Sequence, residues 1–168
     1  VYRDGGDIVT EQVTDQGEVI QRFSLADIPL TCDGALDFQV ENAMAAIAAA
    51  GGLGLDSDIA RAGLPSFVHD APTAPGRFNR YAYRGATVIA DYGHNPDAIG
   101  ALVKAIDNLP AARRSVVISG AGDRRDIDIR RQTEILGEAF DDVLLYEDQC
   151  QRGRAHGEGP GLLRDGLS

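Results

Sequence analysis

Lysine and tryptophan are nearly or wholly missing from this sequence. Its 168 residues include fifteen arginines, a single lysine, Lys104, and no tryptophan. The nucleotide-binding P-loop, G-x-x-x-x-G-K-S/T, needs a lysine that reaches the β- and γ-phosphates. Lys104 lies in a segment predicted to be helical and not in a glycine-rich loop. If a nucleoside triphosphate is used, residues outside this sequence must hold most of it.

Cysteine is scarce, and long apolar runs are absent. Cys32 and Cys150 lie far apart without metal-ligand spacing, which favours two reduced thiols in a cytoplasmic protein. No apolar run reaches the roughly eighteen residues of a membrane span, and no signal peptide is recognisable. We therefore expect a cytoplasmic protein with no membrane partner.

Positive charge is outweighed by negative charge. The formal net charge is −10, which disfavours a nucleic-acid partner. The composition, 43% hydrophobic and 25% charged, is typical of a globular protein. Because Val1 is not an initiator methionine and opens a β-rich stretch, we expect a fragment of a longer chain.

The first part of the chain changes from strand to helix. Residues 1–24 alternate and turn as a hairpin or short meander. Helical spacing in QVENAMAAIAAA predicts a helix ending at Gly51 and Gly52, and a short helix follows, capped by Asp56 or Ser57. The proline-rich stretch HDAPTAPGRF then marks a domain boundary, so we expect domains at 1–74 and 75–168.

After this boundary, strands and helices alternate. RYAYRGATVIADY predicts a hairpin ending in a buried strand, and RSVVISGAG and DDVLLYED predict two more strands. Helices are predicted at 96–109, at 127–140 and from GPGLLRDGL onward. This order predicts an α/β fold with a mainly parallel, Rossmann-like sheet.

Polar residues cluster where the three predicted parallel strands end. The segments are Asp91–Asn95, Ser119–Asp126 and Tyr146–Arg154. Ligands of open α/β sheets bind beyond the carboxyl ends of the strands. Since folding alone does not require so many arginines there, we interpret this edge as functional and expect the three loops to meet.

Each loop also allows a plainer interpretation. GAGDRRD could be a flexible turn or an anion cradle at a helix N-terminus, where Arg124 and Arg125 could bind a carboxylate or phosphate. Arg130 and Arg131 fit a solvated helix face paired with Glu134.

His94 could be a core histidine, but its position in a turn favours contact with a ligand. A metal site formed by Asp91, His94 and Asp97 would need side chains that point in different directions, and we predict no metal ligands.

Several motifs resemble one superfamily. DYGHNPDAI resembles the D-Y-A-H-N/T-P-D signature that opens the C-terminal domain of Mur ligases and folylpolyglutamate synthases. PGRF resembles the motif joining their central and C-terminal domains, and DFQVENAMAAIAAA the helix near the end of their central ATPase domain. From Ile28 onward, the order of motifs is most similar to the Mur-ligase-like half of cyanophycin synthetases.

The resemblance implies site residues at matching positions. Asn42 would contact adenine, Arg77 the phosphates or ribose, and Asp91 the ribose region, with Tyr92 and Asn95 also lining the nucleotide cleft. The implied amino-acid-binding residues are His94, Gly120, Gly122, Asp123, Arg124, Arg152 and Arg154, and His94 is also the candidate catalytic residue.

The resemblance also implies an activity. Such enzymes use ATP and Mg²⁺, bound mainly upstream of this fragment, to convert a carboxylate into an acyl phosphate that an amine attacks. In cyanophycin synthetases, arginine is added to aspartate side chains of an acidic polymer. Glu147, Asp148 and Glu158 could hold a guanidinium group or could form a solvated face. We expect the full-length protein to be a homo-oligomer and the fragment alone to be inactive.

Three alternatives stay open at this point. A Mur-type peptidoglycan ligase or a folylpolyglutamate synthase would share the chemistry but differ in the acceptor. A binding module could sense nucleotide without turnover, and a structural subunit could assemble with an active homologue. The sequence departs from the family in two places: it ends early at HGEGPGLLRDGLS, so we expect a last helix or strand of the C-terminal domain to be absent from it, and its unusual QCQRGRAH loop leaves the preferred amino acid open.

Overall fold

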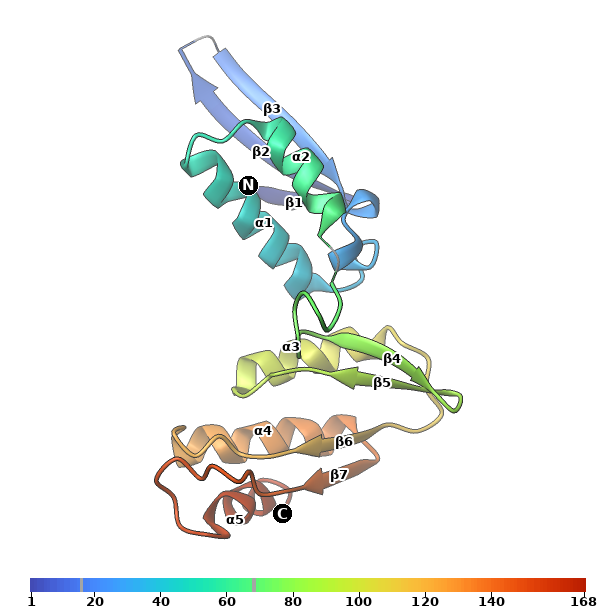
Figure 1. The fold of residues 1–168 in the computed structure, drawn as a ribbon, viewed down its shortest axis with the longest axis vertical. Coiled ribbons are helices and arrows are strands. Elements are labelled where there is room, and N and C mark those ends of the chain that lie inside the picture. The colour runs from blue at the N-terminus through green and yellow to red at the C-terminus, as the bar shows by residue number, and fades with distance from the viewer. Residues whose placement is uncertain (16, 68) are drawn as a thin grey trace. The chain divides into compact units, whose positions relative to one another are not determined.

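The computed structural model describes residues 1–15, 17–67 and 69–168. The chain forms two compact units, Val1–Tyr92 and Gly93–Ser168 (Figure 1). The division into domains 1–74 and 75–168 stays a prediction.

The first unit begins with an antiparallel meander. Strands β1 (Tyr2–Asp4), β2 (Asp7–Thr14) and β3 (Gly17–Ser24) pair in the order β1-β2-β3. The predicted β-rich start is thereby confirmed. Ile8 on β2 lies opposite Phe23 on β3, and both side chains are buried.

Helix α1 (Asp37–Gly52) covers one face of this sheet (Figure 1). Two short 3₁₀ turns, η1 (Leu25–Asp27) and η2 (Pro29–Thr31), connect β3 to α1. The helix ends at Gly51 and Gly52, as its sequence predicts. The shared core consists of Ile8, Phe23, Leu25, Ile28, Val40, Ala43 and Ile47.

Helix α2 (Ser57–Ser66) is capped by one of the two predicted residues. The side chain of Asp56 accepts a hydrogen bond from the Asp58 amide at 2.9 Å. Arg61 donates to the Arg22 carbonyl and lies over the Phe23 ring, 4.7 Å from its centroid. Helix α2 is thus tied to the meander by a polar and an aromatic contact.

A hairpin closes the first unit, as predicted. Strands β4 (Asn79–Tyr83) and β5 (Ala86–Ala90) are antiparallel, and Arg84 and Gly85 between them have φ values of 48° and 83°. Positive φ at both central residues matches the right-handed twist of a hairpin.

The prediction that β5 is buried is wrong. Val88 is 47% exposed, and Tyr81, opposite it on β4, is 45% exposed. Val88 and Tyr81 therefore lie on a face of the two-stranded hairpin that is open to solvent.

The second unit is built on the one parallel pair among the described strands. Strands β6 (Ser115–Ile118) and β7 (Asp142–Leu145) run parallel, and helices α3 (Pro96–Asp107) and α4 (Asp126–Ala139) pack on one face. Helix α5 (Glu158–Asp165) packs against α4 through Leu162 and Leu163. The three predicted helices are confirmed to within about two residues.

The prediction of a mainly parallel, Rossmann-like sheet is only partly correct. The fold is α/β, but its described sheets are small and mixed: β1-β2-β3, β4-β5 and β6-β7. The expected third parallel strand, β5, has β4 as its hydrogen-bonded neighbour. In the described structure, β5 therefore pairs with an antiparallel strand of its own hairpin and not with a parallel strand, as had been expected.

No helix in the described part of the chain is long and apolar enough to cross a membrane.

Candidate functional site

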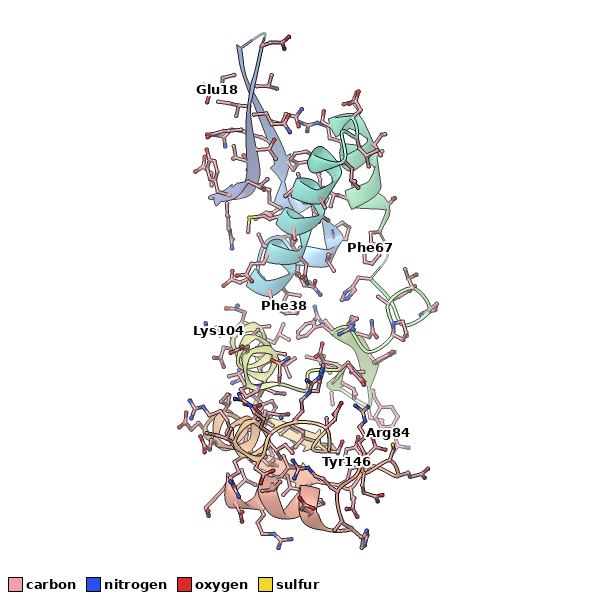
Figure 2. All side chains as sticks on the ribbon, turned by 90° about the vertical axis from the view of Figure 1, so that its left-hand side faces the viewer. Glu18, Phe38, Phe67, Arg84, Lys104 and Tyr146 are labelled. Atoms are coloured by element: carbon pink, nitrogen blue, oxygen red, sulfur yellow. The ribbon has the colours of Figure 1, made fainter. Side chains whose placement is uncertain are left out.

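The first candidate site is a tight turn at residues 74–79, which we call the Gly76 turn. Gly76 and Phe78 both have left-handed backbones, with φ values of 67° and 55°. Phe78 is buried, and its ring packs edge-to-face on Phe38 with centroids 5.8 Å apart. Phe38 lies in the first turn of α1 and is labelled in Figure 2. The turn is therefore anchored to the core of its unit.

The end of β5 holds this turn from the other side. The Phe78 amide donates to Oδ2 of Asp91 at 2.9 Å, and the Tyr92 amide donates to the Gly76 carbonyl at 2.7 Å. The guanidinium carbon of Arg77 lies 5.7 Å from the centroid of the Tyr92 ring, within reach of a cation–π contact. The structure thus brings together Arg77, Asp91 and Tyr92, three of the predicted nucleotide-binding residues.

Asn42 and His69 lie in the same unit as the Gly76 turn, and His69 is close enough to Asp91 to be influenced by its charge. The Asn42 side-chain amide donates to Oε1 of Gln39, one turn earlier on α1, at 3.0 Å. Nε2 of His69 is buried and has no hydrogen-bond partner among the described residues. Burial lowers the pKa of His69, against an opposing effect of the Asp91 charge. No periodic pattern or motif in the sequence indicated His69.

The second candidate site comprises the loops after β6 and β7, residues 119–125 and 146–157, which we call the arginine loops. Arg154 joins them: its side chain is only 13% exposed and donates to the carbonyls of Gly122 at 3.0 Å and Arg124 at 2.6 Å. It also pairs with Asp126 at 2.8 Å and Glu158 at 2.6 Å. The hydrogen bonds with these two carboxylates raise the pKa of Arg154.

Arg152 makes a more exposed link between the same loops. Its Nη1 lies 3.1 and 3.2 Å from the two carboxylate oxygens of Asp123, and the side chains are 40% and 49% exposed. Partial desolvation pushes the pKa of Asp123 upward, but its own backbone amide and Arg152 outweigh that effect. The pKa of Asp123 therefore lies below its usual value.

Gly122 is the point of closest approach between the arginine loops. A Cβ atom at this position would lie 2.0 Å from the Gln151 carbonyl oxygen and 2.9 Å from its carbon. At Gly120 the nearest atom to such a Cβ would be a methyl carbon of Ile129, at 3.2 Å. The glycines of GAGDRRD thus allow the second loop and α4 to pack closely.

The adjacent arginines of this motif have different surroundings. Arg125 is exposed and makes a two-pronged ion pair with Asp128, at 2.8 and 2.9 Å. Nε of Arg124 is buried and has no hydrogen-bond partner among the described residues. A buried donor without a partner is unusual in a native protein and calls for an explanation.

A small pocket opens between the arginine loops and α5. Its volume of about 10 Å³ is roughly that of one water molecule. An amino acid could bind there only if the lining loops moved. The lining residues are Gly120, Gly122, Tyr146, Glu147, Asp148, Cys150, Gln151, Arg154, Gly159 and Pro160.

The three acidic residues considered for a guanidinium group differ in their contacts. Glu147 accepts from the Gly157 amide at 2.6 Å and pairs with His156. Glu158 accepts from Arg154 and from the Ala155 amide. Asp148 is exposed and accepts from the Cys150 amide at 3.3 Å. Glu147 and Glu158 therefore organise the loop itself.

The remaining predicted residues lie at the start of the second unit. Oδ1 of Asn95 accepts from the Ala98 amide at 2.9 Å and so caps α3, and half-buried His94 immediately precedes this cap. The loop Asp91–Asn95 runs from the first unit into the second. The structure brings the second and third predicted loops together, while the meeting of all three stays a prediction.

The solvated helix face is confirmed for Arg131, which pairs with Glu134 at 2.7 Å. The partner of Arg130 is Asp165, at 3.6 Å. Within the described ranges, no group of three or more His, Cys, Asp or Glu side chains is arranged to hold a metal ion.

Comparison with known proteins identifies the class of the chain. Residues 76–158 match the family "Mur ligase, glutamate ligase domain". The chain therefore carries a Mur ligase C-terminal domain, which includes both arginine loops and the Gly76 turn from Gly76 onward.

The particular relatives include cyanophycin synthetases. The chain is 37% identical to the cyanophycin synthetase of Crocosphaera subtropica over 153 residues, which are 90% of this chain and 17% of that protein. It is 36% identical to that of Synechocystis sp. over 140 residues, covering 83% of this chain and 16% of that protein. The chain thus spans about a sixth of the length of these relatives.

Two further similarities point to the same family. A UDP-N-acetylmuramoyl-L-alanyl-D-glutamate–2,6-diaminopimelate ligase from Bradyrhizobium diazoefficiens is 37% identical over 114 residues, 67% of this chain and 22% of that protein. The solved structure of Mycobacterium tuberculosis folylpolyglutamate synthase, complexed with ADP and AMPPCP, superimposes with a TM-score of 0.64 and 26% identity. This match covers 98% of the present chain and 37% of the other.

Proposed function

We propose that this chain is part of an ATP-dependent ligase that joins a carboxylate to the amino group of an amino acid. The specific reaction we propose is addition of arginine to the aspartate side chains of cyanophycin. The observation that carries this proposal is the extent of similarity: it reaches 90% of the chain for a cyanophycin synthetase and 67% for a diaminopimelate ligase. Both units of the chain are therefore accounted for by the first relative.

The proposed reaction has two steps. The γ-phosphoryl group of ATP is transferred to a carboxylate oxygen, and ADP leaves. The amine nitrogen then attacks the carbonyl carbon of the acyl phosphate, phosphate leaves with the bridging oxygen, and the nitrogen loses a proton. His94, in the turn before α3, is our candidate for the residue that accepts this proton.

In this proposal the Gly76 turn contributes to the ATP site. Arg77, whose guanidinium lies over the Tyr92 ring, would present its charge to phosphate oxygens. Asp91 would orient the same region, since its carboxylate already fixes the Phe78 amide. Asn42 would approach the adenine, and residues outside this chain would supply the triphosphate loop and the Mg²⁺ ligands.

The arginine loops would bind the incoming amino acid. Arg124 suits its α-carboxylate, because a ligand carboxylate could satisfy the buried Nε that has no partner. We assign Arg154 a supporting role, since its hydrogen bonds and ion pairs lie between the loops themselves. Exclusion of water by closure of the loops would protect a hydrolysable acyl phosphate.

The first test is phosphate release from ATP by the full-length protein with an aspartate-rich primer. Arginine, lysine and diaminopimelate are supplied in separate reactions. Of the three amines, we expect only arginine to support turnover. Turnover with diaminopimelate would instead support the Mur-type alternative, and ATP binding without turnover for any amine would support a non-catalytic module.

A pair of neighbouring variants tests the amino-acid site. Arg124→Met should raise the KM for the amino acid roughly 10- to 100-fold, because one charged hydrogen-bonding group is lost. Arg125→Met is the matched control, since Arg125 is exposed and pairs with Asp128 in its own helix. Equal effects of the two substitutions would contradict the role proposed for Arg124.

A further inference from the structure

Asn79 is a buried polar residue that bridges the Gly76 turn. It is 2% exposed and is the first residue of β4. Its Oδ1 accepts a hydrogen bond from the Gly76 amide at 2.7 Å, and its Nδ2 donates to the Ala74 carbonyl at 3.1 Å. These partners fix the orientation of the side-chain amide, because one offers only a donor and the other only an acceptor.

The turn needs such a bridge because of its backbone. Two of three successive residues, Gly76 and Phe78, have left-handed conformations. This region is accessible to glycine but uncommon for a bulky residue such as phenylalanine. Hydrogen bonds from groups outside these two residues therefore stabilise the turn, and they involve the Asn79 side chain, the Asp91 carboxylate and the Tyr92 amide.

Arg77 lies between the two left-handed residues. The Asn79 amide fixes the backbone before it, at Gly76, and the Asp91 carboxylate fixes the backbone after it, at Phe78. With both neighbours held, the direction in which the Arg77 side chain leaves the backbone is fixed, and its guanidinium lies over the Tyr92 ring.

We infer that Asn79 is a positioning residue for Arg77: its side-chain amide fixes the turn that presents the Arg77 guanidinium to the phosphates of ATP. This inference rests on the proposed function. Both hydrogen bonds described for the Asn79 side chain go to backbone groups, and Asn79 is 2% exposed, so in this inference it acts through Arg77 and not by contact with nucleotide. The amide is required because a carboxylate could accept from Gly76 but could not donate to Ala74.

The decisive experiment is a double-mutant cycle between positions 79 and 77 in the full-length protein. Asn79→Leu should raise the KM for ATP about tenfold and leave the KM for the amino acid within about twofold. In an Arg77→Met background, Asn79→Leu should have little further effect on the KM for ATP, because the residue through which it acts is already gone. Additive effects would overturn the inference.

A milder variant and a matched control separate positioning from loss of stability. Asn79→Asp keeps the size and the acceptor and should give an intermediate effect. Thr31→Val is the control: Thr31 is fully buried, and its hydroxyl donates to Ile28 and accepts from the Gly34 amide in a turn of the same unit. It should lower stability without changing the KM for ATP. If Thr31→Val changed the KM for ATP as much as Asn79→Leu does, the inference would be wrong.

Hydrogen exchange tests the turn without relying on ATP chemistry. The Gly76 amide should exchange at least tenfold faster in Asn79→Leu than in the wild type, and no faster in Thr31→Val. Unchanged exchange at Gly76 would overturn the positioning role even if the enzyme is an ATP-dependent ligase. If the full-length protein does not use ATP, the proposed function fails and the ATP role of Arg77 fails with it, whereas accelerated exchange would still support the bridge.

Discussion

The Gly76 turn and the arginine loops are held together by different chemistry. In the turn, the side-chain amide of Asn79, which is 2% exposed, and backbone groups make most of the bonds, and the Asp91 carboxylate is the one charged group among those described. In the loops, charged side chains make the links, and the pair Arg152–Asp123 is 40% and 49% exposed. Arg154 differs from Arg152 and Arg125 in this respect, with a side chain only 13% exposed.

This difference bears on how the two regions respond to ligand and solvent. Ions screen exposed charge pairs, which contribute little at physiological salt, whereas buried neutral hydrogen bonds are hardly affected by salt. We therefore expect the turn to keep its shape in the absence of ligand. The arginine loops enclose a pocket with room for about one water, and we expect them to rearrange when an amino acid binds.

Gly122→Ala should have the largest effect, because it separates the arginine loops where they touch. The added Cβ would lie 2.0 Å from the Gln151 carbonyl oxygen, so one backbone must move. We expect a loss of about 3 kcal/mol in the free energy of unfolding, the upper end for overpacking, because a backbone atom and not a flexible side chain lies in the way. Urea unfolding and the KM for the amino acid measure this effect, and the KM for ATP should change less.

Gly161→Ala is the matched control for that substitution. Gly161 lies in α5, where an added Cβ would meet no atom within 4 Å. Alanine in a helix interior is more favourable than glycine by roughly 0.5–1 kcal/mol, so this variant should be as stable as the wild type or more stable. If Gly122→Ala behaved in the same way, the close contact between the loops would be disproved.

Arg154→Met and Arg152→Met sharpen the comparison between buried and exposed links. Arg154→Met removes hydrogen bonds to two carbonyls and two ion pairs, and it should cost about 1.5–3 kcal/mol. Arg152→Met removes one exposed pair and should cost about 0–1 kcal/mol, decreasing at high salt. Urea unfolding at low and high salt measures both, and a larger loss for Arg152→Met would reverse our assignment of the two arginines.

The smallest expected effect is a dependence on pH at Asp142, at the start of β7. Hydrogen bonds from Arg113 at 2.7 and 2.6 Å and from Ser115 at 2.8 Å lower the pKa of Asp142 from 3.8 to about 2. Because the folded state favours the ionised carboxylate, its stabilising effect is present above about pH 4 and is lost as the pH falls toward 2.

Asp142→Asn and Arg113→Met should both flatten the pH dependence of unfolding in this range. Thermal unfolding between pH 5 and pH 2 measures the slope. A wild-type slope in Asp142→Asn would show that other carboxylates account for the acid sensitivity of the second unit.

Local sequence patterns predicted most of the elements but not how the strands associate. The helices at α1, α3 and α4 follow from apolar spacing, helped by the glycines that end α1 and by Pro96 at the start of α3, and these signals act within a few positions of each other. The burial of β5 was predicted wrongly because an apolar run at the end of a strand does not specify which layer covers it. Val88 is exposed although its sequence resembles that of a buried strand.

The candidate site shows the same limit. Motifs indicated Arg77, Asp91 and Tyr92, and the structure brings them together. Asn79 was missed because both partners of its side chain are backbone groups, whose positions depend on the turn. Arg124 and Arg154 looked equivalent in sequence, and only the packing of the loops distinguishes them. Nε of Arg124 is buried without a partner among the described residues, whereas the Arg154 guanidinium bridges the two loops.

The left-handed backbone at Phe78 has a consequence for which residues this position tolerates. Burial and the contact with Phe38 require a large ring, whereas a positive φ favours glycine or asparagine. No standard residue satisfies both demands fully, because glycine would leave a hole in the core and a β-branched residue would strain the backbone. Few side chains are therefore tolerated at position 78, and phenylalanine occurs there because the packing of its ring stabilises the fold by more than the left-handed backbone costs.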